Sequence, residues 1–229
     1  MDPVAEIALW TGLFVGMHFL LSSEPVRTRL VGRVGAQPFR GIYSLVAIGT
    51  FIPMVVVFGH NKHAGAMLWN LRGAPAARGL TWLLMFAAVI LLVAGLINPN
   101  PAAIAAPPRN RPTGILKITR HPSFVAFVFF GLGHLLMNGW AGDIIFFSGF
   151  VVLGIVGGIH QDRRKLREIG APYREFLAAT SFFPGAALFG RRVEWSGDDM
   201  PWTAVAIGIA MAIVLVTFHP LMFGGSPFG

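Results

Sequence analysis

Two histidines lie inside hydrophobic segments that are long enough to cross a membrane. His18 lies within Ile7–Ser23 and His134 within His121–Gly142, and neither segment contains a charged residue. An imidazole in hydrocarbon is costly unless it has a partner, so an intramembrane histidine indicates a functional site by default. We therefore take His18 and His134 as the first candidate metal ligands.

Glycines beside these histidines indicate the kind of group they hold. Gly131 precedes His134 by three residues and shares its helix face, while Gly12 and Gly16 precede His18. A missing side chain beside an axial histidine leaves room for a flat macrocycle. The alternative is that each imidazole hydrogen-bonds to a neighbouring helix. We favour the interpretation of the pair as ligands of one porphyrin between two helices.

A second pair, His60 and His63, stands in the sequence His-Asn-Lys-His at the end of another apolar segment. Imidazole binds iron, copper and zinc, so either residue is an alternative axial ligand or part of a transient metal site. A solvated pair at the membrane interface is the competing interpretation. The chain has no cysteine, which excludes disulfides, thiolate-ligated clusters, a cysteine haem ligand and covalent haem attachment.

A basic cluster precedes the segment that carries the second intramembrane histidine. Arg120 and His121 come directly before Pro122, which suits the first turn of a helix. The exposed N–H groups of a helix start favour an anion, so a propionate or a cofactor headgroup could bind here, with Arg40 as a further cation. The alternative is a helix cap. His160–Arg163 ends the next helix on the same side, so the two clusters are expected to lie close together.

Composition places these residues in a membrane protein. Of the 229 residues, 55% are hydrophobic and only 12% are charged, against about a quarter in soluble domains. The net charge of +8 comes from basic residues that flank apolar segments, which argues for a lipid bilayer and against nucleic acid as the partner. We predict an all-α, polytopic helical bundle, a single transmembrane domain over residues 1–229. The six expected transmembrane helices are Val4–Ser22, Gly41–Gly59, Gly79–Ile97, Pro122–Asn138, Asp143–His160 and Pro201–Leu221.

Three further expectations concern packing and the connecting segments. Gly154 and Gly158 predict close helix packing. Gln161–Ser181 is expected to form two short amphipathic helices along the cytoplasmic surface, separated at Gly170 and Pro172. Asn98–Pro112, with five prolines, is expected to be extended.

The distribution of basic residues predicts the orientation. Fifteen of the 18 Lys and Arg residues fall on one side of the six segments. The other side carries only Lys62, Arg72 and Arg78. The positive-inside rule then places the fifteen in the cytoplasm and both termini in the periplasm.

Several of these segments together resemble the NnrU family of integral membrane proteins, which is similar to the zeta-carotene isomerases of plants and cyanobacteria. The resemblance covers about Leu13 to Pro184 and leaves out the final expected helix, residues 201–221. The segments are Gly16-Met17-His18, Arg40-Gly41-Ile42-Tyr43-Ser44, Leu68-Trp69, Gly114-Ile115-Leu116-Lys117-Ile118-Thr119-Arg120-His121-Pro122, Gly133-His134-Leu135-Leu136-Met137-Asn138-Gly139, Asp162-Arg163-Arg164-Lys165-Leu166, Tyr173 and Thr180-Ser181-Phe182-Phe183-Pro184.

The resemblance implies haem b held by histidines in a bacterial inner membrane. Its ligand positions fall on His18 and His134, with His60 as a third, exchangeable ligand. The implied activity is a step in nitrogen-oxide (denitrification-linked) metabolism or a redox-dependent isomerisation like that of the carotene isomerases. The implied partners are a hydrophobic small molecule or a redox protein.

Two other functions compete with this one. Arg120, His121, Asp162 and Arg163 also resemble the cytoplasmic site of membrane methyltransferases that use S-adenosylmethionine. The acidic pair and the aromatic–glycine pattern of those enzymes are, however, missing. A non-enzymatic assembly or transport partner, in which the histidines join helices, is the third hypothesis.

Overall fold

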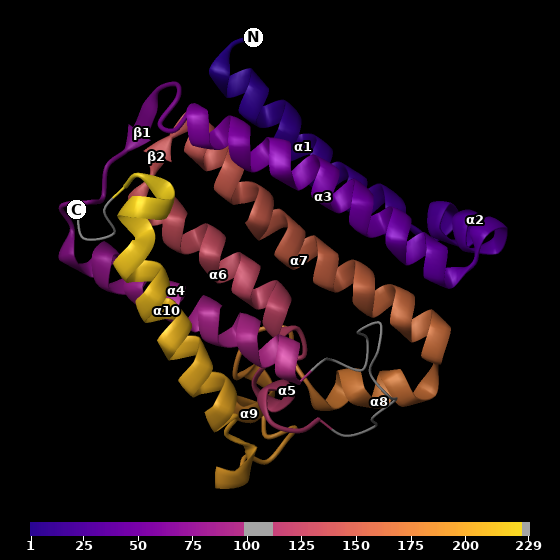
Figure 1. The fold of residues 1–229 in the computed structure, drawn as a ribbon. Helices are drawn as coiled ribbons and strands as arrows, with labels where there is room; N and C mark the ends of the chain where they lie inside the picture. Colours follow the sequence, from indigo (N-terminus) through magenta and orange to yellow (C-terminus); the bar gives the residue numbers. More distant parts are fainter. Residues whose placement is uncertain (99–111, 226–229) are drawn as a thin grey trace. The chain divides into compact units, whose positions relative to one another are not determined.

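The computed structural model describes residues 1–98 and 112–225, and within these ranges it is almost entirely helical (Figure 1). The predicted all-α class is confirmed. The chain forms two compact units, which we describe separately. The first unit comprises Met1–Thr81 and Gly131–Leu153, and the second comprises Trp82–Phe130 and Gly154–Gly229.

Five helices of the described chain are long and apolar enough to cross a membrane. They are α1 Pro3–Ser22, α3 Ala36–His60, α4 Pro75–Ile97, α7 Ala141–Ile169 and α10 Trp202–Phe223. The sixth expected segment forms α6, Pro122–Met137, whose 16 residues extend about 24 Å, less than the roughly 30 Å of a hydrocarbon core. The protein is therefore a multi-pass membrane protein in which α6 is shorter than the five membrane-spanning helices of the described chain.

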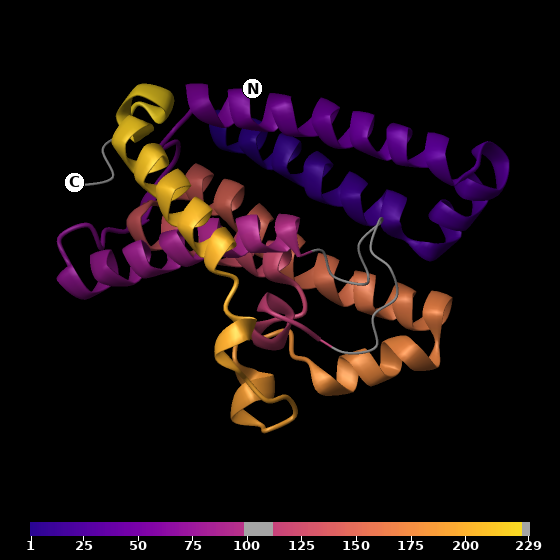
Figure 2. The ribbon, with the colours of Figure 1, turned by 60° about the horizontal axis from the view of Figure 1, so that its bottom comes forward.

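In the first unit, α1 and α3 lie side by side and are joined by a short helix, α2, Glu24–Val34 (Figure 1 and Figure 2). The sequence did not predict α2. Gly149 of α7 allows α1 to approach closely, because a Cβ there would lie 2.6 Å from the Thr11 methyl and 3.5 Å from Val15. The α1 helix therefore packs along the first half of α7.

Two short strands close one end of the first unit. β1, Met67–Trp69, pairs in antiparallel fashion with β2, Gly139–Trp140. Gly139 is required here, since a Cβ would collide with the Trp69 carbonyl. The short link between α6 and α7 is thus partly a strand, because the loop 61–72 supplies a strand partner that no local sequence pattern indicates.

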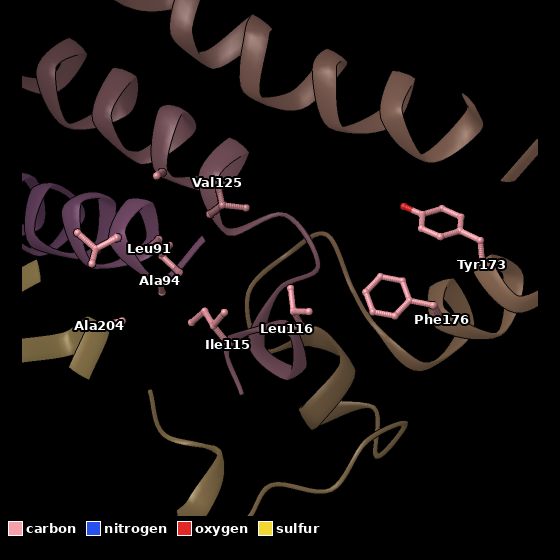
Figure 3. Close-up of a cluster of buried hydrophobic side chains, with 10 residues drawn as sticks. Leu91, Ala94, Ile115, Leu116, Val125, Tyr173, Phe176 and Ala204 are labelled. Carbon is pink, nitrogen blue, oxygen red and sulfur yellow. The ribbon is translucent and has the colours of Figure 1, made fainter. Parts of the chain in front are cut away.

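The core of the second unit joins α4 and α6 to α5, Ile115–Ile118, α8, Ala171–Ala179, and α10 (Figure 3). Gly208 of α10 lies against α4, where a Cβ would be 2.8 Å from the Ile90 Cα. Two short helices, α9 Ala186–Phe189 and η1 Gly197–Asp199, complete the unit. The labelled core side chains are Leu91, Ala94, Ile115, Leu116, Val125, Tyr173, Phe176 and Ala204.

The region after the fifth apolar segment differs in part from the prediction. The break at Gly170 is confirmed, and this residue has φ +75°. The residues before it, however, do not form a separate helix but continue α7 to Ile169, because no helix breaker interrupts them. Close helix packing at Gly154 is confirmed, since a Cβ there would lie 2.6 Å from the Phe124 carbonyl oxygen of α6. Gly158 instead packs against the ring of Phe182, in the segment after α8. Most of the expected extended segment Asn98–Pro112 lies outside the described residues.

Candidate functional site

The candidate ligand His18 is held in one ring orientation by its own helix. Its Nδ1 lies 2.8 Å from the Phe14 carbonyl oxygen, and its ring packs edge-to-face with the Phe14 ring, with 4.4 Å between the ring centroids. A carbonyl only accepts, so Nδ1 carries the proton and Nε2 of the neutral ring keeps its lone pair. Tyr43 of α3 contacts the ring from another side. His18 thus has the arrangement of a metal-ligating histidine whose second nitrogen is fixed by a hydrogen bond.

The glycines near the two intramembrane histidines play different parts. A Cβ on Gly12 or Gly16 would meet nothing within 4 Å, so α1 is open at these two positions, although neither shares a helix face with His18. A Cβ on Gly131 would lie 2.6 Å from Val151 Cγ2 and 2.7 Å from the Phe147 carbonyl oxygen. The prediction that Gly131 leaves room for a macrocycle is wrong, because the close approach of α6 and α7 already fills that room.

His134 lies flat against α7. Its ring stacks on Phe147 with 4.4 Å between centroids and 15° between planes. Thr11 and Val15 of α1 flank Gly149, two residues further along α7 than Phe147. His18 comes three residues after Val15 and so lies further along α7 than His134 does. At 1.5 Å per residue, the two histidines are about 10 Å apart along the α7 axis. Both belong to the first unit, and the offset fits a group that lies tilted between helices.

His60 and His63 are only three residues apart, but they differ in their hydrogen bonding. His60 is the last residue of α3 and is exposed. His63 has φ +60°, and its backbone N–H and ring Nδ1 both donate to the Asp143 carboxylate, at 3.0 and 2.6 Å. Asp143 is completely buried, while the His63 side chain is 42% exposed. The prediction treated the two as one pair, whereas the structure anchors only His63.

Asp143 is a functional candidate that sequence reasoning missed. It is the only charged residue between His121 and Gln161, at the start of the fifth apolar segment. A lone carboxylate at the edge of an apolar run signals a buried partner. The partner itself, 80 residues away, could not be read from the sequence. No group of three or more His, Cys, Asp or Glu side chains suited to a metal ion occurs in the described part of the chain.

A second polar cluster centres on Asp162 in the second unit. Its Oδ1 accepts hydrogen bonds from His121 Nε2 at 2.8 Å and from the Tyr173 hydroxyl at 2.7 Å. Its Oδ2 accepts from Arg120 Nε at 2.8 Å. The predicted proximity of the two polar clusters is therefore confirmed. Burial and the neighbouring Asp162 charge raise the pKa of Tyr173, so its hydroxyl remains a donor at physiological pH.

This Asp162 cluster joins three elements: the residues before α6, the end of α7, and α8. The His121 side chain in this cluster is only 1% exposed. The predicted contact of Arg120 and His121 with a cofactor anion stays a prediction. Arg40 is exposed on α3 of the first unit.

The family follows from the whole length of the chain. The sequence model described as NnrU protein matches residues 6–227. The chain belongs to the NnrU family. The match runs beyond the resemblance found at Leu13 to Pro184 and includes α10, so the last helix is a family feature of this NnrU protein.

Two curated relatives of this NnrU protein are chloroplastic 15-cis-zeta-carotene isomerases. The relative from Arabidopsis thaliana is 27% identical over 237 residues, covering 98% of this chain and 62% of the relative. The relative from Zea mays is 25% identical over 242 residues, covering 99% of this chain and 65% of the relative. The chain thus spans less than two thirds of the length of either. No solved structure matches it.

Proposed function

We propose that this NnrU protein is a haem-b-binding membrane isomerase that changes the geometry of a carbon–carbon double bond in a hydrophobic substrate. The observation that carries the proposal is His18, whose Nδ1 is bonded to the Phe14 carbonyl and whose Nε2 is left for a ligand. The match to two 15-cis-zeta-carotene isomerases supplies the reaction class.

The residues of the first unit fit a haem in three respects. His18 offers an oriented nitrogen, α1 is open at Gly12 and Gly16, and His134 lies in the same unit, offset from His18 by about 10 Å along the axis of α7. The bound iron would supply a redox-sensitive Lewis acid to the substrate double bond. His18 and His134 would hold the iron, and His60 would be an exchangeable third ligand. Arg40, exposed on α3 of the same unit, is the proposed cation for a propionate.

The protein's own contribution is orientation and exclusion of water. The Phe14 carbonyl fixes the His18 ring, and the Phe147 ring supports one face of His134. Aromatic side chains of α3 and α7 surround this region, with Phe58 stacked on Phe146 at 3.8 Å. Such an apolar wall admits a polyene and keeps bulk water from the double bond.

The proposed location is a bacterial inner membrane with both termini in the periplasm, as the distribution of basic residues favours. A hydrophobic substrate reaches such a site from the bilayer. A role in nitrogen-oxide metabolism would use the same iron, with a small polar ligand in place of the polyene.

The test is the absorption spectrum of the full chain purified after expression with haem supply. We expect a Soret band that is lost in His18→Ala and His134→Ala. His219→Ala is the matched control, since His219 lies near the end of α10 and bonds only to the Gly225 carbonyl among the described interactions of its ring nitrogens. A wild-type protein without a Soret band overturns the haem assignment.

The isomerase assignment has its own readout. We expect a cell that accumulates 15-cis-zeta-carotene to convert it when the wild-type chain is expressed, and not when His18→Ala is expressed. A haem-loaded chain that leaves the carotene unchanged contradicts the isomerase reaction while leaving the haem assignment intact. Nitric oxide binding to such a chain would then favour the nitrogen-oxide role.

A further inference from the structure

The helix α2 lies at the membrane surface because it joins two membrane-spanning helices. The chain leaves α1 at Ser22 and enters α3 at Ala36, with α2 between them (Figure 2). Its 11 residues extend about 16 Å. Gly35, with φ +85°, ends the helix in a conformation that favours glycine. These features fix α2 as a short surface helix within the first unit.

The two faces of α2 have different characters. Val26, Leu30 and Val31 are half-buried against the rest of the protein. Arg29 and Arg33 are exposed and stand one helical turn apart on one side of the helix. The exposed face of α2 is therefore basic and carries its two arginines within reach of one another.

Neither exposed arginine has an ion-pair or hydrogen-bond partner among residues 1–98 and 112–225. Two arginines of the second unit, by contrast, are engaged: Arg120 pairs with Asp162, and Arg192 donates to the Thr180 carbonyl oxygen. Between residues 24 and 40 the chain has four arginines and one carboxylate, Glu24, giving this stretch a net charge of +3. The positive charge on α2 is thus left for a partner outside the chain.

We propose that Arg29 and Arg33 form a binding site for the phosphate headgroup of an anionic phospholipid. Guanidinium groups pair with phosphate oxygens through two parallel N–H donors, and two of them one turn apart can hold one headgroup between them. A basic helix at the bilayer surface attracts anionic lipids over neutral ones. The bilayer that surrounds α1 and α3 supplies this partner at high local concentration.

The test is native mass spectrometry of the full chain in detergent with added phosphatidylglycerol or phosphatidylcholine. We expect the wild type to retain phosphatidylglycerol preferentially and the double variant Arg29→Gln/Arg33→Gln to lose about tenfold of that retention. Retention should weaken with salt, because exposed charges are screened. Arg29→Lys/Arg33→Lys should keep much of it, since the charge remains.

The matched control is Arg163→Gln/Arg174→Gln, which removes two exposed arginines elsewhere. We expect it to retain phosphatidylglycerol like the wild type. The proposal is overturned if the α2 double variant retains as much phosphatidylglycerol as the wild type. It is also overturned if the control loses as much, which would indicate a general charge effect. If the wild-type chain binds an acidic peptide at Arg29 and Arg33 but does not retain phosphatidylglycerol, this face would be assigned to a protein partner.

Discussion

Asp143 and His63 are joined by two hydrogen bonds, one from the His63 backbone N–H at 3.0 Å and one from its ring Nδ1 at 2.6 Å. Both oxygens of this completely buried carboxylate therefore accept hydrogen bonds from a single residue of the loop after α3. The Trp140 ring packs against the His63 ring, with 4.2 Å between the ring centroids. This junction ties the loop 61–72 to the start of α7 and holds His63 in its positive-φ conformation.

Asp143→Asn should loosen this loop. An amide retains the size of the carboxylate but loses its charge and one acceptor, so we expect about 1–3 kcal/mol less stability. Hydrogen exchange should rise at residues 61–72 and remain unchanged in α10. A variant whose loop exchanges like the wild type would show that the two bonds to His63 do not hold it.

Asp162→Asn should destabilise the second unit more than Tyr173→Phe does. The asparagine leaves Arg120 without its charged partner, at a cost of about 3 kcal/mol, whereas the phenylalanine removes one of three donors, at about 1–2 kcal/mol. Chemical denaturation in detergent measures both, with Arg163→Gln, an exposed neighbour, expected within about 0.5 kcal/mol of the wild type. Equal losses from the two variants would contradict the central place of Asp162.

Gly131→Ala and Gly16→Ala should have opposite consequences. The first forces a methyl against Val151 and a backbone carbonyl of α7, so a loss of about 1–3 kcal/mol in unfolding free energy is expected. The second meets nothing within 4 Å and replaces a helical glycine, so the apoprotein should be as stable or slightly more stable. If haem lies beside α1, the same Gly16→Ala variant should nevertheless bind less haem, which the Soret absorbance would report.

The ion pair between Lys117 and Asp199 should stabilise the protein in a defined pH range. The hydrogen bond from Lys117, 2.7 Å long, together with that from the Ser196 backbone lowers the pKa of Asp199 from 3.8 to about 2. Because the folded pKa is the lower one, this stability is fully present above about pH 4 and is lost as the pH falls through 2. Near a surface it amounts to at most about 1 kcal/mol.

Thermal unfolding of the wild type and Asp199→Asn measures that contribution. The difference in unfolding midpoint should be constant above pH 4 and should shrink toward zero near pH 2. A difference that persists unchanged at pH 2 would mean that the charge of Asp199 is not its source.

Much of the architecture follows directly from the sequence, because apolar length and helix breakers are local properties. Five membrane-spanning helices, the start of α6 at Pro122 and the break at Gly170 were each predicted from residues within a few positions of the feature. The helix α2 escaped prediction because its short amphipathic pattern is weak and its stability depends on packing against α1 and α3.

The sequence alone selected His18 and His134 as unusual, because an imidazole in an apolar run is visible without a structure. Only the tertiary structure distinguished His63 from His60. Only the tertiary structure showed that Gly131 lies at the close contact between α6 and α7, whereas a side chain at Gly16 would meet nothing within 4 Å. A glycine or a histidine is defined chemically by the sequence. What it touches is set by residues up to 80 positions away, whose approach depends on how whole helices pack.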